Sequence, residues 1–335
     1  MKKQVLSVWV FCSALGIAQA QTDVTKEYLV NPSFETLKTA DGSTDVAVKT
    51  TLENGLYGWE VASMSNYQVE SEASGSATGF PADGSGKIKP TEGTYYYFNR
   101  QGWGNKDSEL KTTTSKELPT GTYYAVIDYK AADYSNNNNA KNNGTTLGIK
   151  VNDAASNLLG ENPAVRRAYS MANNSSNPGS DAYMVNAAWN ELGTMFTVTE
   201  PTTVTISLVQ HMKNSGRSDI AWDNLRLYKI ENVDESKPLD VSGLITTSNY
   251  YALGGWSIEG GNTFQINTWS TEGDTDGSGM TTPFFEDWIG KGTNAANATI
   301  SHTANHLAPG IYEVSGLIRV LNEAGGAAPS GATLY

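Results

Sequence analysis

Apolar and polar residues alternate along several stretches of the chain, which is the period of a β-strand with one buried face. The clearest stretches are Gly121–Ala131, Thr202–Gln210 and Ile220–Ile230. Segments rich in Asn, Ser and Gly, such as residues 134–146, separate them and are typical of long surface loops. A helical pattern is weakly present only at residues 181–192. The chain is therefore expected to be all-β, with strands packed as an antiparallel β-sandwich.

Three patterns occur twice in the same order, which predicts two copies of one module. Each copy holds a Gly-Trp pair, and we expect Trp59 and Trp256 to anchor the cores of their modules. The matching pairs are Leu56–Val61 with Leu253–Ile258, Leu118–Lys130 with Leu307–Arg319, and Gly144–Ile149 with Gly331–Tyr335.

The repeat divides the chain into a leader at residues 1–20, a first sandwich at 21–232, a charged, Pro-containing linker at 233–241 and a second sandwich at 242–335. The second copy lacks the strands that close the first. We therefore expect it to be truncated and the chain to be the N-terminal part of a longer protein. A glycoside hydrolase domain, if the full protein has one, would lie beyond residue 335.

The first 20 residues have the pattern of a bacterial secretory signal peptide. Lys2 and Lys3 precede an apolar run, and Ala18-Gln19-Ala20 is a small-x-small cleavage pattern, so cleavage is expected before Gln21. The run is shorter than the roughly 20 apolar residues of a membrane span, and no later stretch reaches that length. The sequence predicts a secreted or cell-surface protein without a transmembrane segment.

Composition narrows the class of partner. The chain has 33 Gly, 17 Tyr and 8 Trp residues, and only 17% of its residues are charged, which favours extracellular β-structure. Its only cysteine, Cys12, falls in the leader, so disulfides and thiol chemistry are excluded from the mature chain. Loss of Lys2 and Lys3 changes the formal net charge from −12 to −14. Such a charge repels phosphate backbones, and nucleic acid is not an expected partner.

Asp223 interrupts an otherwise apolar strand pattern. If period two holds, it shares a face with Leu225 and Leu227, whereas Trp222 lies on the other face. A carboxylate on an apolar face requires hydrogen bonds, a cationic partner or a metal. The alternative is a strand-end Asp that caps a turn or faces solvent.

Four motifs in order resemble the galactose-binding-like β-sandwich, a jelly-roll fold. More narrowly, they resemble carbohydrate-binding modules of families four, nine and twenty-two, which are found in bacterial cellulases and xylanases. The resemblance covers residues 23–231 and, in truncated form, 239–335. The motifs are LVNPSFE, GW, LPTGTYY and IAWDNLRLYK.

The resemblance implies a structural calcium ion between the first and last strands. It implies that Glu35 and Asp223 supply carboxylate oxygens, and that carbonyls near Ser33 complete the shell. Calcium takes 6 to 8 oxygen ligands of this kind. In the second copy Tyr251 stands where Glu35 stands in the first, so calcium is not expected there.

The aromatic run at residues 94–103 offers a surface for sugar. In a regular strand Tyr95, Tyr97 and Asn99 share one face, opposite Tyr96, Phe98 and Arg100. One set is expected in the core, and the other can stack on sugar rings while polar neighbours bond the hydroxyls. The alternative is that all of them form core and rim. The first candidate for an exposed ring is Trp103, which lies between two glycines, and Trp189 and Tyr134 are weaker ones. The candidate ligand-binding residues are Trp103, Tyr95, Tyr97, Asn99, Arg100 and Trp189.

Catalytic patterns are sparse. The three histidines include His302 and His306, whose spacing lacks the Glu of a zinc-protease helix. No phosphate-binding loop and no Gly-x-Ser-x-Gly turn is present, and no pair of carboxylates is nominated for glycoside hydrolysis. The expected function is binding of a polysaccharide or glycan, alone or as part of a polysaccharide-degrading enzyme. The alternative is a structural or adhesive surface protein in which the sandwiches are spacers.

Overall fold

In the computed structural model the described residues lie mostly in strands, and nearly all the strand pairs are antiparallel. The only helices among its described residues are the short α1 (Thr25–Tyr28) and the 3₁₀ helix η1 (Ser242–Leu244). No described helix has the length and apolarity needed to cross a membrane. The described residues are 20–38, 44–46, 50–51, 56–63, 66–71, 88–101, 106–135, 146–152, 155–160, 166–167, 182–185, 189–212, 217–231, 240–245, 256–260, 263–267, 284–288, 298–304, 306–310 and 312–314.

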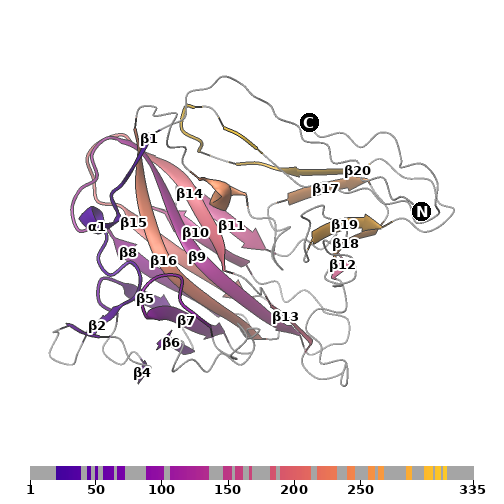
Figure 1. The fold of residues 1–335 in the computed structure, drawn as a ribbon, viewed down its shortest axis with the longest axis horizontal. Coiled ribbons are helices and arrows are strands. Elements are labelled where there is room, and N and C mark those ends of the chain that lie inside the picture. Colours follow the sequence, from indigo (N-terminus) through magenta and orange to yellow (C-terminus); the bar gives the residue numbers. More distant parts are fainter. Residues whose placement is uncertain are drawn as a thin grey trace, which may run out of the picture.

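The larger sheet has eight described strands, all antiparallel to their neighbours. They run in the order β13-β9-β16-β7-β6-β4, with β1 beside β16 and β14 beside β9. The two longest, β9 and β16, form its centre (Figure 1). The strands are β1 (Ala20–Asp23), β4 (Thr50–Thr51), β6 (Asn66–Ser71), β7 (Tyr95–Gln101), β9 (Gly121–Ser135), β13 (Ala182–Val185), β14 (Asn190–Val198) and β16 (Arg217–Glu231).

The smaller sheet has five described strands, in the order β11-β10-β15-β8-β5. Its inward residues and those of the larger sheet belong to one core cluster, so the two sheets form a β-sandwich. The predicted fold class is confirmed. The strands are β5 (Glu60–Ser63), β8 (Lys106–Thr113), β10 (Thr146–Val151), β11 (Ala155–Gly160) and β15 (Thr205–Met212).

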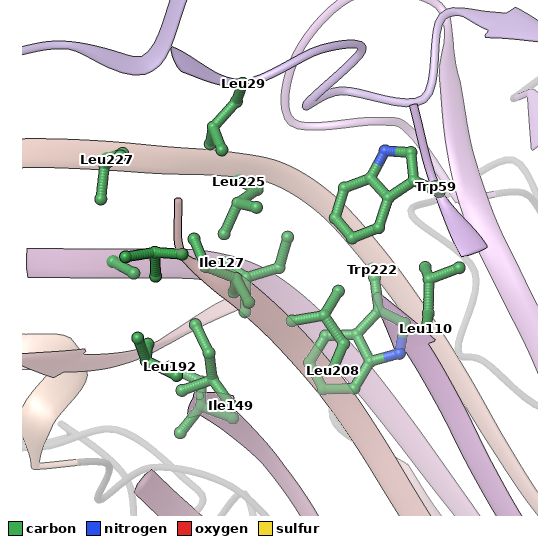
Figure 2. Close-up of a cluster of buried hydrophobic side chains, with 14 of the residues drawn as sticks. Leu29, Trp59, Leu110, Ile127, Ile149, Leu192, Leu208, Trp222, Leu225 and Leu227 are labelled. Carbon is green, nitrogen blue, oxygen red and sulfur yellow. The ribbon is translucent and has the colours of Figure 1, made fainter. Parts of the chain in front are cut away.

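Alternation along the strands explains the core. Ile127 and Leu192 from the larger sheet point toward Ile149 and Leu208 from the smaller one (Figure 2). Trp59 lies in the same cluster and is 6% exposed, as the sequence predicted. Removing such side chains from water supplies most of the stabilisation of the sandwich.

The opening motif fixes the chain entry to this core. Phe34 is fully buried, and its ring centroid lies 4.9 Å from that of Trp59 and 5.5 Å from that of Tyr97. The Trp59 indole N–H donates to the carbonyl of Asn31 at 2.9 Å. Asn31 and Phe34 both have positive φ values, 54° and 61°. The Asn-Pro turn is thus held tightly enough to keep two non-glycine residues in a left-handed conformation.

A second apolar cluster lies on the outer face of the larger sheet. Tyr124 and Met195 pack there against Leu244 of η1 and against Ala308. The hydroxyl of Tyr312 donates to the Ala308 carbonyl at 2.7 Å. Residues C-terminal to the first sandwich therefore cover the part of this face around Tyr124 and Met195.

A stretch expected to be helical, residues 181–192, instead contributes to β13 and β14 of the larger sheet. Its apolar positions pair along β9, and packing overrides a weak local preference.

The remaining described strands form three small sheets. The pairing of β12 with β18 joins residues from either side of the expected domain boundary. These sheets comprise β2 (Thr36–Lys38) with β3 (Thr44–Val46), β17 (Trp256–Gly260) with β20 (Ala298–His302), and β12 (Arg166–Arg167) with β18 (Thr263–Asn267) and β19 (Phe284–Trp288).

Candidate functional site

A β-bulge beside Asp223 reverses the alternation expected from the sequence. The register of β16 against β9 shifts between Asp223 and Arg226, and Asn224 within the gap has a φ of 55°. Trp222, before the bulge, and Leu225, after it, both lie in the core. The expectation that Asp223 shares the face of Leu225 is therefore wrong, because an extra residue breaks period two. Asp223 lies on the outer face of the sheet.

The carboxyl of Asp223 is fully buried by the segment that leads into β7. Its Oδ2 accepts the main-chain N–H of Thr91 at 2.8 Å, the Thr91 hydroxyl at 3.0 Å and the N–H of Glu92 at 3.1 Å. Its Oδ1 accepts the N–H of Asn224 at 2.8 Å. Burial raises the pKa of Asp223 to about 7, although the hydrogen bonds from Glu92, Thr91 and Asn224 act in the opposite direction.

Glu35 binds the other half of the same segment, residues 91–95, which we call the clasp loop. Its carboxyl accepts the main-chain N–H of Thr94 at 3.1 Å and that of Tyr95 at 3.0 Å. Between the two carboxyl sites lies Gly93, with a φ of 65°. Burial raises the pKa of Glu35, and the hydrogen bonds from Tyr95 and Thr94 oppose that effect. The loop is therefore held from both sides by side chains distant in sequence.

The three predicted calcium ligands all reach the clasp loop. The hydroxyl of Ser33 donates to the Glu92 carboxylate at 3.0 Å. The carboxyl oxygens of these residues already accept hydrogen bonds: Oδ2 of Asp223 accepts three, and both oxygens of Glu35 accept main-chain N–H groups. Among the described residues no group of three or more His, Cys, Asp or Glu side chains is placed to hold a metal. Tyr251 of the second copy lies outside them.

Trp189 lies partly exposed over the outer face of the larger sheet. Its indole N–H donates to the Lys89 carbonyl at 2.8 Å, and its ring meets that of Tyr96 edge-on, with centroids 6.2 Å apart. The Lys130 ammonium lies 5.8 Å from the centre of the indole ring. Beneath it the Tyr96 hydroxyl donates to Glu70 at 2.7 Å. Burial and the neighbouring Glu70 carboxylate raise the pKa of Tyr96 far above its usual range.

Two of the candidate sugar contacts are inside the sandwich. Tyr97 and Asn99 are 0% exposed, so neither side chain reaches a ligand at the surface. The amide of Asn99 donates to Gln210 at 2.6 Å and to Ser108 at 3.0 Å, which forms a polar link between the sheets. Tyr95 is partly exposed and packs against the core. The expectation that Tyr97 and Asn99 bind sugar is corrected, because their face of β7 is the one that meets the smaller sheet.

The structure describes only part of the remaining candidate set. Trp103 lies outside the described residues, as do the side chains of Arg100 and Tyr134, whose backbones belong to β7 and β9. Lys130 and Glu70 were not predicted as neighbours of Trp189. The position of Lys130 could have been inferred, because it follows Tyr129 in a strand pattern and so lies on the opposite face, whereas no local pattern indicated Glu70.

An ion-pair network borders the clasp loop on the same face. Arg226 contacts Asp128 and also pairs with Glu191, with 2.9 Å between Nη1 and Oε1. The side-chain amide of Asn224 donates to Asp128 at 3.1 Å. Burial raises the pKa of Asp128, and the nearby Arg226 charge lowers it in part. The network fixes the bulge that carries Asp223.

The chain has low similarity to several solved structures. No protein-family model and no curated protein matches the chain. Similar solved structures include TmCBM61 in complex with β-1,4-galactotriose, at 14% identity over 60% of this chain and 97% of that one, with a TM-score of 0.30. They also include the CBM22-1–GH10 modules of the Clostridium thermocellum xylanase 10B complexed with xylohexaose, at 11% identity over 66% of this chain and 32% of that one, with a TM-score of 0.26.

A third similar structure comes from a study of promiscuous specificity in carbohydrate-binding modules of the β-sandwich superfamily. It has 11% identity over 59% of this chain and 72% of that one, with a TM-score of 0.28. The chain is an all-β protein built on an antiparallel β-sandwich, and the solved structures similar to it include carbohydrate-binding modules.

Proposed function

We propose that this chain is a secreted glycan-binding protein, or the binding portion of a larger polysaccharide-degrading enzyme, and that Trp189 is its sugar platform. The observation that carries the proposal is the fixed orientation of the indole. One edge is held by the Lys89 carbonyl, and the ring packs against Tyr96 and Lys130. A partly exposed ring that is already ordered loses little conformational freedom when a sugar stacks on it.

The surroundings of Trp189 support a neutral, hydroxyl-rich ligand. Flat apolar ring faces contact the C–H face of a pyranose, and a few placed polar groups bond its hydroxyls. The formal net charge of −12 disfavours polyanionic ligands. Among the described residues, η1 and Ala308 cover the part of this sheet face around Tyr124 and Met195. Trp103 and Arg100 remain candidate contacts.

Export is part of the proposal and is supported by the Lys pair, the apolar run and the Ala-Gln-Ala pattern of the leader. Two tandem modules would add avidity if both engage one glycan chain. The second candidate function is that of a structural or adhesive spacer. It is favoured by the cluster around Met195 and Leu244, which joins the first sandwich to the residues that follow it.

A polysaccharide-binding assay separates the two functions. The chain lacking residues 1–20 is tested on a glycan array and by pull-down with insoluble plant and host polysaccharides. Trp189→Ala is expected to weaken binding by about five- to thirtyfold, since loss of one stacked ring removes about 1–2 kcal/mol. Tyr57→Ala removes another exposed aromatic ring and serves as the matched control. No binding by the unmodified chain, or full binding by a folded Trp189→Ala variant, would reject the proposal.

A further inference from the structure

The clasp loop is bound by two carboxyl groups that divide its main-chain N–H groups between them. Asp223 takes the N–H groups of Thr91 and Glu92, and Glu35 takes those of Thr94 and Tyr95. The two acids come from the last strand of the sandwich and from the segment next to its first turn. Four main-chain donors, two on each side of one glycine, thus bond to two side chains that are 188 positions apart.

Gly93 is required at the centre of this arrangement. A Cβ atom there would lie 2.4 Å from Oε1 of Glu35 and 2.5 Å from its carboxyl carbon. Its φ of 65° is also in the left-handed region, which other residues rarely adopt. The Glu35 carboxyl therefore packs directly on the glycine backbone.

We propose that Glu35 and Asp223 join the first turn, the clasp loop and the last strand directly, through main-chain N–H groups, and that this junction is independent of calcium. The hydrogens of the N–H groups carry positive partial charge and point at the carboxyl oxygens, so they compete with a cation for the lone pairs and repel it. The Thr91 hydroxyl adds a third donor to Oδ2 of Asp223. The proposal concerns the assembly of the sandwich and does not depend on glycan binding.

The junction extends to Trp189. Lys89, whose carbonyl accepts the indole N–H, lies two residues before the clasp loop, so the segment that fixes the ring runs directly into the loop that the carboxyls hold. Loosening the junction is expected to release the loop and then the indole. This connection gives the proposal a second readout, the local environment of Trp189.

The first arm of the test uses the unmodified chain without its leader. Calcium is titrated into it by isothermal titration calorimetry, and its thermal unfolding is followed with calcium and with EDTA. We expect no saturable heat and the same Tm in both conditions. A stoichiometric heat signal, or a Tm that falls by several degrees in EDTA, would overturn the proposal.

The second arm uses Gly93→Ala and Asp223→Asn, with the exposed Glu117→Gln as the matched control. Both variants are expected to lower the Tm by the same amount with and without calcium, while the control leaves it unchanged. Calcium that restores the Tm of the unmodified chain but not of Asp223→Asn would identify a metal site instead. If a variant does not fold, the calorimetric arm still decides, because it needs only the unmodified chain.

Discussion

Asp223 accepts both the main-chain N–H and the side-chain hydroxyl of Thr91, which precedes it by 132 residues. The two contacts join the last strand of the sandwich to the loop that begins β7. Because the carboxyl is fully buried, loss of either donor would leave a carboxyl oxygen with one hydrogen bond fewer in place of the water that it loses on folding.

Thr91→Val tests the hydroxyl contact. Valine keeps the shape of threonine and the main-chain N–H but cannot donate from its side chain. We expect the free energy of unfolding to fall by about 1–2 kcal/mol, as measured by urea denaturation. Thr91→Ser keeps the hydroxyl and is the matched control. Equal stability of the valine and serine variants would show that the hydroxyl contributes little.

The raised pKa of Asp223 predicts a pH dependence of stability. The folded pKa, about 7, lies above the ordinary value of 3.8, so the folded state binds the proton more tightly than the unfolded state. The stabilisation is complete below about pH 4 and is lost as the pH rises to about 7. The pKa values of Glu35 and Asp128 are raised as well, which adds in the same direction.

The measurement is the free energy of unfolding between about pH 5 and about pH 8, where we expect a decline of about 1–3 kcal/mol. Asp223→Asn does not titrate and is expected to flatten the profile, because only the smaller contributions of Glu35 and Asp128 remain. A profile that rises over this range, or one that is unchanged by the substitution, would contradict the assignment.

Two buried tyrosines on the larger sheet are predicted to respond oppositely to loss of the hydroxyl. The Tyr96 hydroxyl donates to Glu70, whereas the Tyr124 hydroxyl is buried with no hydrogen-bond partner among the described residues. Tyr96→Phe is expected to lower stability by about 1–3 kcal/mol, and Tyr124→Phe to leave it unchanged or raise it. Parallel chemical denaturation of both variants checks this. Destabilisation of Tyr124→Phe equal to that of Tyr96→Phe would indicate a water or other partner at Tyr124.

Trp189→Phe separates stacking from positioning. Phenylalanine keeps an aromatic face but cannot donate to the Lys89 carbonyl, so the ring loses its fixed orientation. For a glycan that the unmodified chain binds, we expect the binding free energy to weaken by about 1 kcal/mol. This loss is smaller than the one expected for Trp189→Ala. Titration calorimetry with the same ligand compares the three proteins. A phenylalanine variant as weak as the alanine variant would mean that the indole N–H contact matters more than the ring.

Much of the fold could be predicted from the sequence, because a strand with one buried face has apolar residues at every second position. The strands at Gly121–Ala131 and Ile220–Ile230 were predicted correctly, and so was the burial of Trp59. Residues 181–192 were misjudged, since a short apolar segment fits either period and only its pairing with β9 decides.

The site was harder to predict from the sequence because the residues that form it lie far apart along the chain. The family resemblance paired Glu35 with Asp223 as calcium ligands, but nothing local predicted that both accept hydrogen bonds from the segment around Gly93. The face to which Asp223 belongs, and the side of β7 that meets the core, depended on a bulge and on sheet packing. Local sequence thus determined the strands and the chemical groups, whereas long-range register decided which groups meet, because each acid must pair with N–H groups that only the tertiary structure brings near it.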